Sequence, residues 1–219
     1  MAEFETTGFV LKRQNFGEAD RLLKIFTRDL GLVTVLAKGV RKPRARFGAA
    51  VELFNEISLR LYRRTSEIFL LIEAGCPKIF GNQNLKNLRS LFLAAEILLA
   101  LNPPEKKLPK IYSNFYHFLN ILKKSNSPPF PQQVESGSIC SLAFTLKTLT
   151  ILGFFTPQKI AHKNQQKICQ TLLAKNFTEI WPLKIATGDF TTIGVTLLKT
   201  LQEILERDLR TPTATLQWF

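Results

Sequence analysis

The sequence has few residues of the kinds that build metal sites and disulfides. Its three cysteines, Cys76, Cys140 and Cys169, lie far apart without paired spacing, and its two histidines are His117 and His162. No zinc site or disulfide framework can be written from such a set. We therefore expect no metal and no cofactor, and we expect reduced cysteines packed as small apolar groups in a cytoplasmic protein.

Long apolar runs are also missing. No charge-free apolar stretch approaches the roughly 18 residues that a membrane-spanning helix needs. The opening residues MAEFETTGF carry acids where a secretory signal peptide would place lysines before an apolar run. The sequence therefore predicts a cytoplasmic protein with no membrane segment.

Carboxylates are scarce relative to cations. The 219 residues include 17 acidic and 30 basic side chains, which gives a formal net charge of +13. Such a balance favours polyanionic partners, with nucleic acid first, anionic lipid second and acidic peptides third.

Signals for an enzyme are thin. The segment RKPRARFG lacks the arrangement of a phosphate-binding P-loop, so ATP use is not predicted. Glu18, Asp20 and Asp29 are the candidates for a magnesium-dependent nuclease. Glu18 and Asp20, however, belong to the turn GEAD, where acids also serve as caps and local hydrogen-bond acceptors. We expect a protein without catalytic residues.

The first 80 residues follow the two-residue period of β-strands. The segment VELFNEISLRLYRR, from Val51, predicts a long strand, and shorter strands are predicted over residues 6–13, 21–29, 31–39 and 67–75. Five short strands in about seventy residues would expose a long edge unless they curl into a barrel. The barrel that fits this length is the OB-fold.

After Pro77 the pattern becomes helical. Helices are predicted over residues 83–101, 107–124, 138–153, 157–175 and 190–207. The expected class is α+β, with an OB-fold nucleic-acid-binding domain over residues 1–80 and an α-helical bundle over residues 81–219.

A basic segment leaves the third predicted strand, at the rim of the barrel. Its sequence LAKGVRKPRARFG carries five cations and no carboxylate: Lys38, Arg41, Lys42, Arg44 and Arg46. Cations spaced along a rim loop can neutralise successive phosphates without reading sequence. The alternative is a solvated surface loop.

The strand that follows adds flat side chains. Phe54, Arg60 and Tyr62 are spaced by multiples of two, so they are predicted to point the same way, beside the basic segment. Stacking of bases on such groups is common in single-strand binding. The alternative is that the helical half covers the aromatic rings, and both interpretations stay open.

A family resemblance rests on these residues. The run from TTGFVL through GEADRLLKIFTRDLG to LAKGVRKPRARFGAAVELFN resembles the N-terminal domain of the bacterial RecO family of DNA repair and recombination mediators. The segments AFTLKTLTILGFF and LLKTLQEILERDLRT are similar to helices of the family's second domain.

The resemblance implies a non-enzymatic, nucleoid-associated protein that binds single- and double-stranded DNA and anneals complementary strands. It implies three partners: RecR, the acidic tail of single-strand DNA-binding protein, and RecA, whose loading it assists. Many members carry four zinc-binding cysteines after the Leu-Gly-Phe element. Here that region retains only His162 and Cys169, so no structural zinc is expected.

A docking site for the acidic tail needs an apolar patch beside a cation. Phe144 and Ile151, seven residues apart on the predicted helix 138–153, lie on a different face from its main apolar stripe, with Lys147 close to them. These three residues are the predicted partner site, and the alternative is a helix buried on two sides.

Two other classes stay open. An RNA-binding or ribosome-associated OB-fold protein would share the charge and the barrel, and a structural adaptor would bind protein through its helices. The ending TATLQWF places Trp218 and Phe219 either in the core or on the surface as a handle.

Overall fold

The computed structural model describes residues 2–45, 47–63, 67–78, 85–124 and 136–206. They form two compact units. Unit 1 comprises Met1–Asn82 with Leu101–Tyr112, and unit 2 comprises Gln83–Ala100 with Ser113–Phe219.

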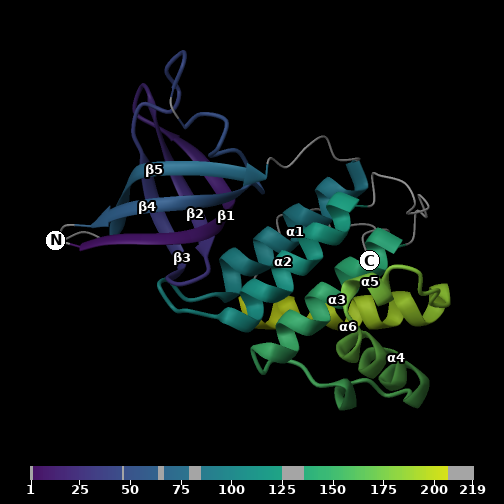
Figure 1. Cartoon of the computed structure of the whole chain (residues 1–219). Coiled ribbons are helices and arrows are strands. Elements are labelled where there is room, and N and C mark those ends of the chain that lie inside the picture. The colour runs from purple at the N-terminus through teal and green to yellow at the C-terminus, as the bar shows by residue number, and fades with distance from the viewer. Residues whose placement is uncertain (1, 46, 64–66, 79–84, 125–135, 207–219) are drawn as a thin grey trace. The chain divides into compact units, whose positions relative to one another are not determined.

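Unit 1 is a closed five-stranded barrel with the strand order β1-β2-β3-β5-β4. Strands β3 and β5 pair in parallel, and the other neighbours are antiparallel. Figure 1 draws this barrel in purple to blue, and helices follow it along the chain. The predicted OB-fold and α+β class are confirmed. The strands are β1 (Ala2–Phe16), β2 (Asp20–Thr27), β3 (Gly31–Ala37), β4 (Glu56–Arg63) and β5 (Ile68–Lys78).

Strand β1 closes the barrel because it is long enough to pair on both sides. Residues 2–9 pair with β4 and residues 8–16 pair with β2, with a register shift between Val10 and Lys12. The two ladders overlap at Gly8, where a Cβ atom would lie 2.8 Å from Cγ2 of Ile25. The crossing is therefore too close for a side chain.

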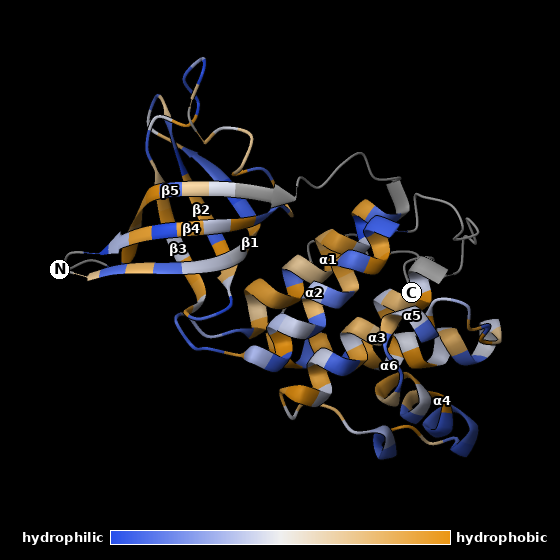
Figure 2. Cartoon of the chain, viewed as in Figure 1, coloured by the Kyte–Doolittle hydropathy of each residue, from blue (hydrophilic) through white to orange (hydrophobic). Residues whose placement is uncertain are grey.

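The barrel interior is filled by alternating apolar side chains, as a closed sheet requires. Figure 2 shows the alternation of hydrophilic and hydrophobic residues along the strands. The members of this core are Val10, Leu23, Ile25, Val33, Val35, Ala37, Val40, Ala50, Val51, Ile57, Leu59, Leu61, Phe69 and Leu71.

The predicted long strand from Val51 is wrong at its beginning. Residues 49–54 form turns, and β4 begins only at Glu56. Phe54 adopts the left-handed region with φ +64, while its backbone N–H donates to the carbonyl of Val10 at 2.9 Å. Phe54 is 1% exposed, so its ring is not open to a base. The sequence predicted Phe54 on the outward face of a strand, whereas in the structure it belongs to the turn before β4 and is buried.

Residues 101–112 complete unit 1. Tyr112 packs against Phe9 and Phe26, with ring centroids 5.3 and 5.7 Å apart, and so covers apolar side chains on the outside of the barrel. Gly31, with φ +72, meets this segment closely, because a Cβ atom there would lie 2.1 Å from the carbonyl oxygen of Lys106. Glycine is required at this position by backbone conformation and by space.

Unit 2 is helical. Its elements include α1 (Leu85–Leu101), α2 (Pro109–Lys124), α3 (Ser136–Ile151), the 3-10 turn η1 (Pro157–Lys159), α4 (Lys163–Ala174), α5 (Phe177–Ile180) and α6 (Thr187–Leu205), the first and second of which share residues with unit 1. The predicted helix 157–175 begins only at Lys163 because η1 precedes it, and α5 was not predicted. A capping box at Asn176 and Glu179 starts that short helix.

The core of unit 2 is aromatic around α3. Phe144 stacks on Phe118 with centroids 4.8 Å apart and meets Phe115 edge-on at 6.0 Å. The buried amide of Asn114 donates to the carbonyl of Phe144 at 3.3 Å and to the Thr148 hydroxyl at 3.0 Å. The buried amide nitrogen of Asn114 is thus hydrogen-bonded, as burial favours.

Candidate nucleic-acid interface

The basic segment is an ordered loop tied to the β1–β2 turn. The N–H of Gly39 donates to Oδ1 of Asp20 at 2.7 Å, and the N–H of Arg41 donates to the carbonyl of Ala19 at 2.9 Å. The guanidinium of Arg41 also donates to the carbonyl of Gly17 at 3.2 Å. The β1–β2 turn and the loop that follows β3 are therefore held together at one end of the barrel.

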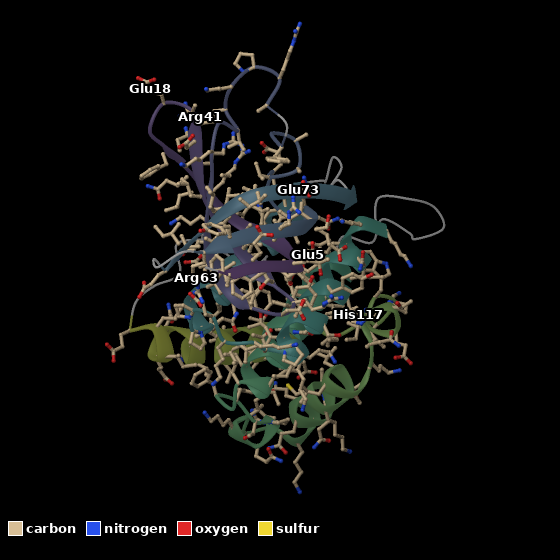
Figure 3. All side chains as sticks on the ribbon, turned by 60° about the vertical axis from the view of Figure 1, so that its left-hand side comes forward. Glu5, Glu18, Arg41, Arg63, Glu73 and His117 are labelled. Carbon is tan, nitrogen blue, oxygen red and sulfur yellow. The ribbon has the colours of Figure 1, made fainter. Side chains whose placement is uncertain are left out.

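The cations of this loop point into solvent. Lys38, Arg41, Lys42 and Arg44 are all exposed, and Figure 3 shows Arg41 close to Glu18 at the projecting end of the barrel. Among the described residues, no ion pair involves any of these four cations. Their charge is available to an external anion. Arg46, the fifth predicted cation, lies outside the described residues.

Behind the loop, Glu52 holds two arginines. Its Oε1 accepts from Arg21 at 2.9 Å, and its Oε2 accepts from Arg13. Burial, and then the charges of Arg13 and Arg41, lower the pKa of Arg21. Guanidinium charge is therefore dense at this end of the barrel, and one carboxylate partly neutralises it.

The outer face of β1, β2 and β3 carries further cations that the sequence analysis missed. Lys12 lies opposite Lys24, and Lys24 lies opposite Thr34, whose hydroxyl accepts from its Nζ at 2.7 Å. Like charges directly opposite one another are unfavourable in a sheet. We call this surface, with Lys12, Lys24 and the adjoining Lys38, the basic face.

The outer face of β4 is different from what its sequence suggested. Arg60 donates to Glu73 at 2.7 Å, and its other cross-strand neighbour is Glu5. Tyr62 lies opposite Glu3 and is half-buried. We call this surface, with Glu3, Glu5, Arg60 and Glu73, the paired face; Figure 3 shows Glu5 and Glu73 on the body of the barrel, away from Arg41. Its carboxylates repel phosphate and weaken the attraction of Arg60 for DNA. That Arg60 and Tyr62 bind DNA stays a prediction.

The three carboxylates considered for a nuclease do not converge. Asp20, at the start of β2, accepts from the backbone of Gly39, whereas Asp29 follows the other end of β2 and accepts from the Thr6 hydroxyl at 2.8 Å. Glu18 is exposed at the β1–β2 turn. Asp20 and Asp29 therefore have local structural partners.

The cysteines of unit 2 are buried. Burial raises the pKa of Cys169 to about 11 and raises the pKa of Cys140 further, so both are poor thiolates. His162 is exposed before α4. In the part of the chain that the structure describes, no group of three or more histidines, cysteines or carboxylates could hold a metal ion.

The predicted docking residues do not form one accessible patch. Phe144 is 1% exposed in the core of unit 2. Lys147 donates to the carbonyls of Leu173 and Lys175 at 2.8 and 2.9 Å, where it satisfies the C-terminal end of α4. Of the three residues, only Ile151 is exposed. Helix α3 is packed on several sides, which buries Phe144 and partly buries Lys147.

Trp218 and Phe219, predicted either in the core or on the surface, lie outside the described residues. No helix of the described residues is both long and apolar enough to cross a membrane.

Comparison with known proteins gives matches to one family. Residues 1–78 match the family model "Recombination protein O N terminal". The chain is 32% identical over 157 residues to the DNA repair protein RecO of Rubrobacter xylanophilus, and 29% identical over 156 residues to that of Symbiobacterium thermophilum; each match covers 70% of this chain. It is 45% identical over 62 residues, 28% of this chain and 26% of the relative, to that of Thermobifida fusca.

The chain spans 59% and 58% of the length of the first two of these relatives. The expected family resemblance is confirmed over the barrel and into the helical unit, on the strength of the family model and several relatives of one name. The chain belongs to the RecO family.

Proposed function

We propose that this protein is a non-enzymatic DNA-binding mediator of recombination in DNA repair. It binds single- and double-stranded DNA through its barrel and promotes annealing of complementary strands. The observation that carries the proposal is the group of exposed cations in the loop, Lys38, Arg41, Lys42 and Arg44, for which the described residues supply no ion-pairing carboxylate.

The binding step is electrostatic. Each phosphate that a lysine or arginine neutralises releases condensed counterions, and the gain does not depend on base sequence. The loop and the basic face together place Lys12, Lys24, Lys38 and Arg41 on one side of the barrel. A phosphate backbone can follow these cations without displacing a carboxylate of the protein.

Annealing follows from the same charge. Two DNA strands repel each other at close approach, and a protein of formal charge +13 lowers that repulsion while base edges stay free to pair. No acid, base or metal chemistry is needed. We propose residues 1–80 as the DNA-binding domain and residues 81–219 as a helical domain available to partner proteins.

The relatives' name, DNA repair protein RecO, supports the biological setting. The partners that the family resemblance implies belong to this proposal: RecR, the tail of single-strand DNA-binding protein, and RecA, whose loading the protein assists in the cytoplasm. The structure of the described residues supplies no separate argument for any of them.

An annealing assay tests the proposal. The full chain is mixed with complementary oligonucleotides, with and without single-strand DNA-binding protein, and the rate of duplex formation is followed by fluorescence. We expect a large acceleration that falls steeply with salt. A rate equal to that of the DNA alone would contradict the proposal, and tighter binding to RNA than to DNA of equal length would favour an RNA-binding protein.

A further inference from the structure

An aromatic side chain stands in solvent at the tip of the β1–β2 hairpin. Phe16 is 54% exposed, more than any other large hydrophobic side chain of the described residues. Burial of a phenylalanine side chain stabilises a protein, and at this position most of that stabilisation is absent. The barrel core does not need the ring at this position.

The tip that carries Phe16 is fixed in place. Gly17, with φ +56, makes the turn, and its carbonyl accepts from Arg41 at 3.2 Å. Phe16 lies opposite Asp20, whose carboxylate accepts from the N–H of Gly39 at 2.7 Å. The ring is therefore held beside the basic loop by contacts on both sides of the turn.

The ring also continues the basic face. Side chains alternate along β1, so Phe16 points the same way as Lys12, with Gln14 between them. Four residues of strand separate the Lys12 and Phe16 Cα atoms by roughly 13 Å. The ring thus shares the face of Lys12 and lies at the hairpin tip that contacts the basic loop.

We propose that Phe16 is a stacking platform for an unpaired nucleobase and gives this surface a preference for single-stranded over duplex DNA. The inference rests on the proposed function, because the cations must hold the phosphates. A base of a single strand can turn onto an open ring, whereas the bases of a duplex are already stacked on one another. Stacking of this kind tolerates every base, since each has a π-face.

A nucleobase fits this ring better than an acidic peptide does. A peptide side chain would need an apolar slot that surrounds it, and the residues beside Phe16, which are Asn15, Gly17 and Glu18, are exposed at a projecting tip. Stacking needs only one accessible ring face, which a hairpin tip supplies.

Three ligands of equal length separate the contributions in the full chain: oligo(dT), an abasic single strand with the same phosphates, and a blunt duplex. Binding is measured by fluorescence anisotropy at fixed salt. For Phe16→Ala we expect about tenfold weaker binding to oligo(dT), within a range of about 5- to 100-fold, and less than about twofold change for the other two ligands. Phe16→Trp should keep the affinity and add tryptophan quenching on binding to oligo(dT).

Phe92→Ala is the matched control, because Phe92 is 41% exposed on α1 of unit 2, and it should bind all three ligands like the wild type. Equal losses on all three ligands for Phe16→Ala, or no loss on any, would overturn the inference while leaving DNA binding intact. The inference would also be overturned if Phe16→Ala bound oligo(dT) like the wild type but lost affinity for an acidic, phenylalanine-ended peptide. A wild-type chain that binds none of the three DNAs would instead remove the proposed function.

Discussion

The cations of unit 1 fall into two regions that differ in what faces them. On the paired face and near the β2–β3 turn, cations have carboxylate partners: Arg60 with Glu73 at 2.7 Å, Arg63 with Glu105 at 2.5 Å, and both Arg28 and Lys107 with Asp29. On the basic face and its loop, the described residues give Lys12, Lys24, Lys38, Arg41, Lys42 and Arg44 no ion pair. The position of available charge, more than the net charge, is the basis on which we propose where DNA binds.

The largest effect is expected from the loop. Replacing Arg41, Lys42 and Arg44 together with alanine removes up to three phosphate contacts. The slope of log K against log salt should flatten by about 2 for single strands and about 3 for duplex DNA, with roughly hundredfold weaker binding to single strands at 0.1 M salt. Titrations at several salt concentrations measure both quantities.

The three residues are exposed, so the thermal midpoint of this triple variant should stay near that of the wild type. An unchanged salt slope in a folded variant would mean that the loop does not contact phosphate, and the distinction between the two regions would lose its main support.

A matched pair of lysine and arginine sharpens the comparison. Lys24 and Arg60 are both half-buried cations in the middle of strands, but Lys24 faces Lys12 and Arg60 faces two glutamates. We expect Lys24→Ala to flatten the single-strand salt slope by about 0.7, which is about fivefold in affinity at 0.1 M salt. Arg60→Ala should change the affinity by less than about twofold, and an equal effect of the two substitutions would erase the difference between the faces.

The sequence alone could not predict most of the difference between the basic face and the paired face. The alternation in RLLKIF identified β2, and the five-strand count led to the barrel, because those signals are local. The pairing of Arg60 could not be predicted from a local signal, because its partner Glu73 belongs to another strand. Phe54 was assigned to a strand face because the turn that ends at Asn55 interrupts an otherwise regular apolar period.

The missed residues of the basic face have a local cause. The strand was predicted to end at residue 13, whereas β1 continues to Phe16 beyond a register shift near Leu11. That shift places Lys12 and Phe16 on the outer face and Arg13 on the inner one. A bulge of this kind re-aims side chains and has no clear signature in this sequence.

Glu52 offers a way to enlarge the unpaired group. Glu52→Gln removes the carboxylate shared by Arg13 and Arg21, so two guanidinium groups become available behind the loop. We expect about threefold tighter DNA binding at 0.1 M salt and a slope steeper by about 0.5 to 1. The variant should lose up to about 1 kcal/mol of stability, since the pair is partly exposed.

Denaturant unfolding and salt titration of the same preparation check both effects of Glu52→Gln. Weaker DNA binding without loss of structure would show that Glu52 holds the loop in a shape that DNA requires, and that its carboxylate does not compete with phosphate.

The smallest effect is expected from Asp29, the carboxylate partner of Arg28 and Lys107 near the β2–β3 turn. Its pKa is lowered chiefly by the hydrogen bond from the Thr6 hydroxyl, with burial opposing and Arg28 and Lys107 assisting. A depressed pKa in the folded state stabilises the protein above the unfolded value of about 3.9, and this contribution is lost as the pH falls through the folded value.

Asp29→Asn should therefore cost less than about 1 kcal/mol at pH 7, because the carboxylate is about one-third exposed, and the difference from wild type should shrink below about pH 4. Urea unfolding at pH 7, 5 and 3 measures this difference, while the DNA salt slope at pH 7 should not change. A flatter DNA salt slope in Asp29→Asn would mean that Arg28 or Lys107 contacts DNA only when Asp29 holds it in place. The presence of a carboxylate partner would then no longer distinguish cations that bind DNA from cations that do not.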